Sequence, residues 1–130
     1  MHKDPSRELS EYRINRAFEL IADAENLFAA GSYKSANNRA YYAIFHAMRA
    51  VLALDNEDFK KHSGVIQYFQ KNYIKTEKFD KEYSNIITTA TTVRNASDYD
   101  DFYIASKEAT EQQIADAKKF CEAVKSFIQA

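Results

Sequence analysis

Helix-breaking residues are almost absent from this chain of 130 residues. It contains two glycines and one proline, and the proline stands at position 5, ahead of the first apolar pattern. Proline breaks or kinks a helix interior and glycine weakens it, so long helices can run through nearly the whole sequence. Apolar residues recur at three- and four-residue steps, and no stretch shows the period of two that is typical of strands. The sequence therefore predicts an all-α fold.

The apolar periodicity predicts five helices in a single domain over residues 1–130. Ser6 or Asp4 is expected to cap the first helix and Gly31 to end it, because small polar residues favour N-caps and glycine favours the position after a C-cap. Short links between long helices favour antiparallel neighbours, so we expect an up-and-down bundle of four to five helices. The predicted helices cover about residues 6–30, 32–54, 64–74, 79–96 and 106–129, with a polar loop over 55–63.

Composition narrows the classes of function. The formal net charge is −1; residues 1–75 carry 11 Lys or Arg and 9 Asp or Glu, whereas residues 76–130 carry 7 and 10. This balance argues against strong electrostatic binding of nucleic acid but permits a local basic patch. Cys121 stands alone and no apolar run is long enough for a signal sequence or a membrane span, so we expect a cytoplasmic protein without membrane association. The three histidines lack metal-site spacing, and neither a metal nor a cofactor is expected.

The helix predicted over residues 32–54 has two contrasting faces. One is an ordinary apolar stripe. The opposite face places polar side chains between alanines and lacks the Lys and Glu of a solvated helix; its members are Arg39, Tyr42, Ala43, His46, Arg49, Ala50 and Ala53. Small residues permit close approach, and Tyr and Arg are enriched at interfaces, so this face is a candidate for contact with a second chain or a ligand. The alternative is a central position in the bundle, with Tyr42 and His46 held by local hydrogen bonds.

Arg94 is predicted to lie on the inward arc of the helix over residues 79–96, because it follows Ile87 by seven residues and Ala90 by four. A guanidinium cannot lose its charge, so an inward arginine needs a carboxylate, carbonyl groups or a bound anion nearby. Asp98, four residues on, is the obvious local partner. Two interpretations stay open, namely an Arg94–Asp98 pair that ties off the helix end and an arginine that faces a phosphate.

Three stretches together resemble a known family: NNRAYYAIFHAMRAVL (37–52), KKHSGVIQYFQKNYIKT (60–76) and VRNASDYDDFYIASKEA (93–109). They are similar to the HEPN-domain proteins, the higher eukaryotes and prokaryotes nucleotide-binding family, and specifically to its small stand-alone prokaryotic branch. The resemblance covers nearly the whole chain in order and spacing. It implies a helical bundle that usually forms a homodimer and often pairs with a small nucleotidyltransferase, as toxin and antitoxin.

Many HEPN proteins are metal-independent ribonucleases, whose motif is an Arg followed after four to six residues by a His. Carried onto Arg94, the motif requires His at 99–101, where this chain has Tyr99, Asp100 and Asp101. Arg39 and His46 have six residues between them, but they lie on the second helix, away from the motif position.

The missing motif His favours a non-catalytic interpretation. We expect a dimeric module that binds a nucleotide, RNA or a nucleotidyltransferase. One alternative is a ribonuclease with a variant site, and another is a helical bundle that binds a small molecule. The variant ribonuclease site would use Arg94, Asp98 and Tyr99, and the candidate nucleotide- or RNA-binding residues are Arg94, Asp98, Tyr99, Arg39, Tyr42 and His46.

Overall fold

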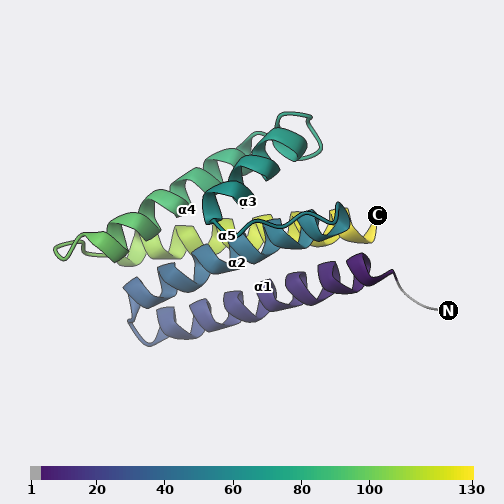
Figure 1. Ribbon diagram of the computed structural model, residues 1–130. Coiled ribbons are helices and arrows are strands. Elements are labelled where there is room, and N and C mark those ends of the chain that lie inside the picture. The colour runs from purple at the N-terminus through teal and green to yellow at the C-terminus, as the bar shows by residue number, and fades with distance from the viewer. Residues whose placement is uncertain (1–3) are drawn as a thin grey trace.

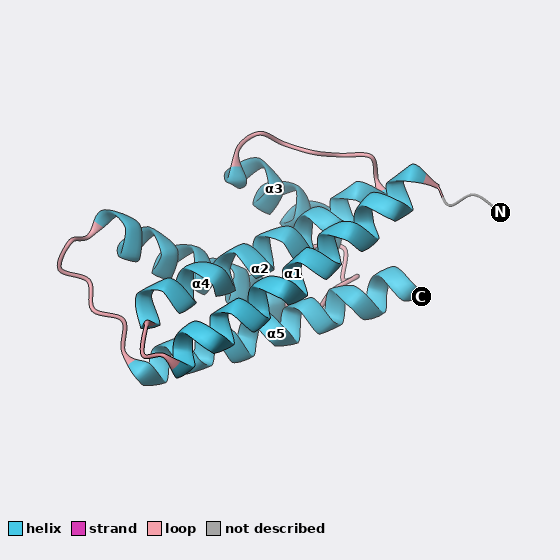
Figure 2. Cartoon of the chain, turned by 90° about the horizontal axis from the view of Figure 1, so that it is seen from below, coloured by secondary structure: helices cyan, strands magenta, loops and turns pink. Residues whose placement is uncertain are grey.

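The computed structural model describes residues 4–130, and the regular elements in that range are all helices (Figures 1 and 2). Four long helices alternate in direction, and a short helical segment lies between the second and third of them (Figure 1). This architecture confirms the predicted all-α bundle. The elements are α1 (Pro5–Ala29), α2 (Tyr33–Leu54), α3 (His62–Phe69), the π-helix η1 (Gln70–Ile74), α4 (Glu82–Tyr99) and α5 (Lys107–Gln129).

The ends of α1 follow the predicted signals. Asp4 caps its beginning, because the carboxylate accepts the N–H of Ser6 at 3.1 Å. At the other end Gly31 has a φ of +80°, a left-handed conformation that glycine adopts without steric cost. The N–H groups of Gly31 and Ser32 then donate to the carbonyls of Phe28 and Leu27, which closes the helix with a Schellman motif. The chain turns back at once, so that α2 runs antiparallel to α1 (Figure 1).

Helix α2 is the central element of the bundle and packs against α1, α3, α4 and α5. Its predicted apolar stripe is buried, with Ile44, Met48 and Val51 at most 1% exposed. The alanines of the opposite face are buried too, because the chain's own helices cover them; these are Ala43, Ala50 and Ala53. This corrects the hypothesis that the small residues form a free surface for a second chain. The central position that the sequence left as the alternative accounts for them.

Several helix boundaries differ from those predicted, and one of them is the beginning of α3, at His62 rather than Gly64. α4 begins at Glu82 rather than Phe79, because the Asp80 carboxylate accepts the Glu82 N–H at 3.0 Å. Phe79 is 5% exposed and belongs to the core although it lies before the helix, so its apolar character misplaced the boundary. α4 also continues to Tyr99, and the third predicted helix is divided into α3 and the wider turns of η1. A π-helix has more residues in each turn than an α-helix, and this change needs no Gly or Pro that would mark it in the sequence.

Substitution of Ala47 by Leu tests the close packing around α2. Ala47 has no exposed surface, and a buried position of this size has no room for three additional carbon atoms. Ala47→Leu is expected to lower the free energy of unfolding by about 1–3 kcal/mol. Urea denaturation measures the change, with Ala22→Leu as the control because Ala22 is exposed on α1. Equal stability of the two variants would contradict the central position of α2.

Candidate functional site

Aromatic and basic side chains gather where the middle of α2 meets α1, α4 and the beginning of α3. The rings of Tyr41, Tyr42 and Phe45 lie within ring-contact distance of His62, with centroids 5.9, 5.7 and 4.0 Å away. Cationic side chains come to this place from three helices. We call the whole cluster the basic aromatic face and define it as Arg13, Tyr41, Tyr42, Phe45, His46, Arg49, His62 and Arg94.

Arg94 reaches this face from α4 and lies against two tyrosine rings. Its guanidinium carbon is 5.2 Å from the ring centroid of Tyr41 and 5.8 Å from that of Tyr42. Its Nη2 also lies 3.5 Å from the Tyr42 hydroxyl. Cation–π contacts of this kind hold a guanidinium in place while its edges stay available for hydrogen bonds.

Asp98 pairs with Arg94, as predicted from their spacing. The Nε of Arg94 lies 2.8 Å from Oδ2 of Asp98, and the two side chains are 20% and 32% exposed. The contact is an ion pair rather than a hydrogen bond, because the buried Nε–H is not directed at an acceptor anywhere in residues 4–130. Arg94 is thus inward-facing, paired with a carboxylate and still not fully hydrogen-bonded, so both interpretations of the sequence remain compatible with its position.

His62 belongs to this face although it is not among the candidates that the sequence predicts, because its partner on α2 is distant in sequence. Its Nδ1 lies 2.9 Å from the hydroxyl of Tyr41, a residue 21 positions away on α2. Burial raises the pKa of the Tyr41 hydroxyl, so this group keeps its proton. This buried hydroxyl proton needs an acceptor, and its hydrogen-bond contact within residues 4–130 is Nδ1, so we assign Nδ1 as the acceptor. The imidazole proton is left on Nε2, and neutral His62 presents an N–H donor.

His46 lies in a positive field. Burial lowers its pKa to about 4, and the charges of Arg49, Arg16 and Arg13 act in the same direction. His46 is therefore neutral at neutral pH. The local hydrogen bond expected for it is absent from residues 4–130, which corrects that part of the central-helix interpretation. The field itself is informative, because three arginines act on one ring in a chain of net charge −1.

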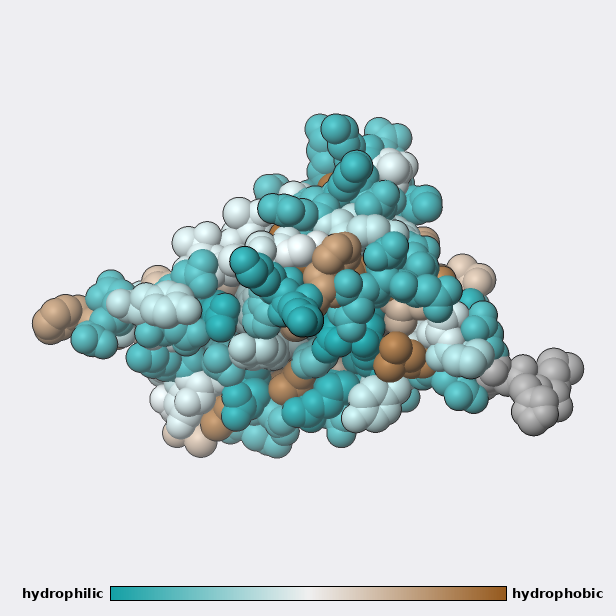
Figure 3. Space-filling view, in the orientation of Figure 1, coloured by the Kyte–Doolittle hydropathy of each residue, from teal (hydrophilic) through white to brown (hydrophobic). Residues whose placement is uncertain are grey.

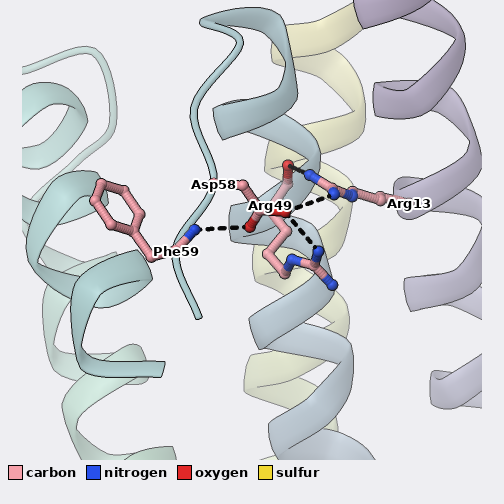
Figure 4. A network of polar contacts seen from close by, with 4 residues as sticks. All are labelled: Arg13, Arg49, Asp58 and Phe59. Carbon is pink, nitrogen blue, oxygen red and sulfur yellow. Dashed lines mark hydrogen bonds and ion pairs between the residues drawn. The ribbon is translucent and has the colours of Figure 1, made fainter. Parts of the chain in front are cut away.

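Asp58 joins α1 to α2 at the edge of the basic aromatic face (Figure 4). Its Oδ2 accepts hydrogen bonds from Arg13 at 3.1 Å and from Arg49 at 2.9 Å, and its Oδ1 accepts the N–H of Phe59 at 2.9 Å. Burial acts to raise its pKa, but these hydrogen bonds and the two arginine charges lower it below the usual value. Asp58 therefore remains charged at neutral pH.

The segment that carries Asp58 also lines an open hollow of about 460 Å³, bounded by Phe45, Arg49, Asp58, Phe59, Lys60 and His62. Phe59 fixes this segment by packing on α3 at Gly64. A Cβ at Gly64 would come within 2.9 Å of the Phe59 Cβ, so glycine is needed for the approach. The hollow combines cationic and neutral hydrogen-bond donors with aromatic rings, which is the chemistry that binds phosphate groups and bases.

Two sequence-predicted candidates lie outside the cluster. Arg39 is exposed and donates to the side chain of its neighbour Asn38 at 2.8 Å, so the spacing of Arg39 and His46 does not bring them together as a site. Tyr99 is the last residue of α4 and is 80% exposed. Of the variant ribonuclease site, the structure therefore joins Arg94 and Asp98 and leaves the Tyr99 ring in solvent.

Residues 4–130 contain no cluster of three or more His, Cys, Asp or Glu side chains placed to hold a metal ion. No helix in the same range is both long and apolar enough to cross a membrane.

Comparison with known proteins identifies the family. The model of the HEPN domain matches residues 10–127. The chain belongs to the HEPN family. It is 33% identical to a UPF0332 protein of Thermotoga maritima over 119 residues, which are 92% of this chain and 90% of the relative. Two proteins of Methanocaldococcus jannaschii are similarly related: "Putative toxin MJ0142" at 34% identity (94% of this chain, 82% of the relative) and "Putative toxin MJ0605" at 33% (99% and 95%).

Arg94 lies in the part of the chain that matches the HEPN domain. The C-terminal end of α4 lies within the matched residues 10–127 and supplies Arg94 to the basic aromatic face. The positions five to seven residues after Arg94 are occupied by Tyr99, Asp100 and Asp101. The histidine that does lie near Arg94 is His62, which comes from another helix.

The low pKa of His46 predicts how stability depends on pH. The unfolded chain binds a proton at His46 near pH 6.5 and the folded chain only near pH 4. Between these values the unfolded state holds more protons, so the free energy of unfolding falls as the pH is lowered through this window. His46→Gln should retain about 1–3 kcal/mol more of its neutral-pH stability at pH 4.5 than the wild type does. Thermal unfolding from pH 8 to pH 4 checks this, and parallel curves for the two proteins would rule it out.

Proposed function

We propose that this HEPN protein binds a phosphate-containing ligand, RNA or a nucleotide, at the basic aromatic face. The observation that carries the proposal is the placement of Arg94 across the rings of Tyr41 and Tyr42, beside two further arginines and the N–H donor of His62. Arginine edges bind phosphate oxygens, and aromatic rings stack with bases. Four of the lining residues of the neighbouring hollow are ionisable, which supports a charged ligand over an apolar small molecule.

The biological setting follows from the relatives. Two of them carry names that describe toxins, and the family resemblance includes a frequent partnership with a small nucleotidyltransferase. We extend this setting to the present chain as one member of a toxin–antitoxin-like pair. The proposal is supported if the protein co-purifies with the product of a neighbouring nucleotidyltransferase gene.

Metal-independent RNA cleavage is the second candidate function, and one observation favours it. The contact between His62 and Tyr41 brings a histidine next to the tyrosines on which Arg94 lies, although the motif positions on α4 lack one. Its tautomer argues for binding instead, since Nε2 carries the proton and cannot act as a base in that form. Cleavage of RNA in the presence of EDTA, lost in both Arg94→Ala and His62→Gln, would establish the ribonuclease instead.

Replacement of Arg94 tests the binding function. Arg94→Ala should weaken the binding of a labelled single-stranded RNA, or of AMP, by about tenfold, because a charge-assisted hydrogen bond to phosphate is lost. It should also lower the free energy of unfolding by about 1–3 kcal/mol, since Asp98 and the two tyrosines lose their partner. Fluorescence anisotropy and urea denaturation measure the two effects. Arg39→Ala is the matched control, being an exposed arginine outside the face, and an equal loss of affinity in both variants would count against the assigned site.

A homodimer is the second part of the proposal, and we place its contact at the end of α4. Three large apolar side chains are exposed there, Tyr99 by 80%, Phe102 by 91% and Ile104 by 87%. Hydrophobic surface projects at the end of the molecule where the α4–α5 connection lies (Figures 1 and 3). Apolar groups of this size exposed together are typical of an interaction surface.

The homodimer predicts a change in mass on substitution of Phe102. Wild-type protein at high micromolar concentration should scatter light as a dimer, and Phe102→Ser should shift the measured mass toward that of a monomer because the contact loses apolar area. Tyr12→Ser is the control, since Tyr12 is 70% exposed on α1, away from this surface. A wild-type protein that stays monomeric at this concentration is the outcome that would refute the dimer.

A further inference from the structure

Asp58 is held in the way that proteins hold a phosphate group. One of its oxygens receives hydrogen bonds from two guanidiniums, Arg13 and Arg49, and the other receives the backbone N–H of Phe59 (Figure 4). Convergent arginine and backbone donors around an anion are the usual arrangement for carboxylate and phosphate recognition. The donors come from α1, from α2 and from the connection between α2 and α3.

The two arginines need an anion between them. The side chain of Arg13 is only 10% exposed, and burial together with the charge of Arg49 lowers its pKa, whereas Asp58 raises it. Arg13 does not depend on Asp58 for its position, because its Nη1 also donates to the Arg49 carbonyl at 3.1 Å. The pair of guanidiniums is therefore built into the bundle, and the anion is the exchangeable part.

The carboxylate of Asp58 is placed so that it can move away from Arg13 and Arg49. Its side chain is 48% exposed, it belongs to a connecting segment without regular structure, and it lines the open hollow together with Lys60 and His62. Ion pairs with this much exposure contribute little to stability, because water screens the charges. A phosphate group entering the hollow offers more acceptor oxygens and more charge than one carboxylate does.

We propose that the space between Arg13 and Arg49 is a phosphate-binding site that Asp58 occupies in the absence of ligand, so that binding exchanges one anion for another. The inference rests on the proposed function and adds a second phosphate position to the one at Arg94. A phosphate here takes the place of the Asp58 carboxylate at Arg13 and Arg49, and Lys60 and His62 line the same hollow. Arg94 lies on Tyr42. Along α2, at a rise of 1.5 Å per residue, Tyr42 is about 10 Å from Arg49. A ligand with more than one phosphate can therefore contact both positions.

Asp58→Asn tests the exchange, because asparagine keeps the size of the side chain and an oxygen for the Phe59 N–H but removes the charge. A short single-stranded RNA and AMP are the two probes, titrated at low salt. The variant is expected to bind about fivefold more tightly than the wild type, the equivalent of one exposed ion pair that no longer has to be broken.

Two controls separate the exchange from a general effect of charge. Glu57→Gln removes one negative charge from the adjacent exposed residue and is expected to change affinity less than about twofold, since within residues 4–130 Glu57 makes no ion pair that a ligand has to break. In an Arg49→Ala background Asp58→Asn should give no gain, because two residues that act at one site are not additive. Thermal unfolding of each variant confirms that it is folded.

The outcomes are distinguishable. A gain for RNA alone identifies the ligand as a polynucleotide, and a gain for AMP as well identifies a phosphate site open to free nucleotides; both support the exchange. Equal or weaker binding by folded Asp58→Asn, or an equal gain in Glu57→Gln, overturns the exchange, while the proposed function stands as long as wild-type binding depends on Arg94. No binding by either the wild type or Asp58→Asn overturns both.

Discussion

The central position of α2 constrains every other element of this fold. A helix that is covered on several sides admits only small, apolar or partnered side chains, and six of the thirteen buried residues of α2 are alanines. Because alanine side chains are small, groups from neighbouring helices reach the backbone carbonyls of α2. Ser10 of α1 donates its hydroxyl to the Ala50 carbonyl at 2.6 Å, and the thiol of Cys121 on α5 lies 3.7 Å from the Ala43 carbonyl. Larger residues on α2 would separate these helices and remove the contacts.

The same constraint assembles the functional face. Polar side chains on α2 cannot all reach water, so they are met by groups from neighbouring elements. Tyr41 is matched by His62 from α3, Tyr42 by Arg94 from α4, and Arg49 by Asp58 from the connecting segment. Arg94 and Arg49 thus place two guanidiniums on one surface of a chain whose total charge is −1. Net charge alone did not reveal this gathering of arginines, because a sum over the chain does not say where the charged side chains lie.

How far the sequence predicts this structure depends on whether an interaction is local. The Arg94–Asp98 pair spans one helical turn and follows from spacing alone, as does the capping of α1 by Asp4. The contact of Tyr41 with His62 spans 21 residues and that of Arg13 with Asp58 spans 45. Both depend on the path of the segment between α2 and α3, for which periodicity gives no information. The alanine face of α2 was misjudged for a related reason, since small residues permit close approach without indicating whether the neighbour belongs to the same chain.

Arg94 and Arg49 are each held in place independently of the carboxylate that neutralises them, which explains how a near-neutral protein can bind phosphate. Arg94 is paired with Asp98, and Arg49 with Asp58, and in both pairs the carboxylate is the more exposed member. The arginines are held by aromatic or backbone contacts that do not depend on the carboxylates, because Arg94 lies on two tyrosine rings and the guanidinium of Arg49 lies 5.9 Å from the Phe45 ring. Each cation is thus fixed in position while its counter-charge is on the solvent side. The free protein remains neutralised, and a ligand that brings its own anions meets guanidiniums already oriented to receive them.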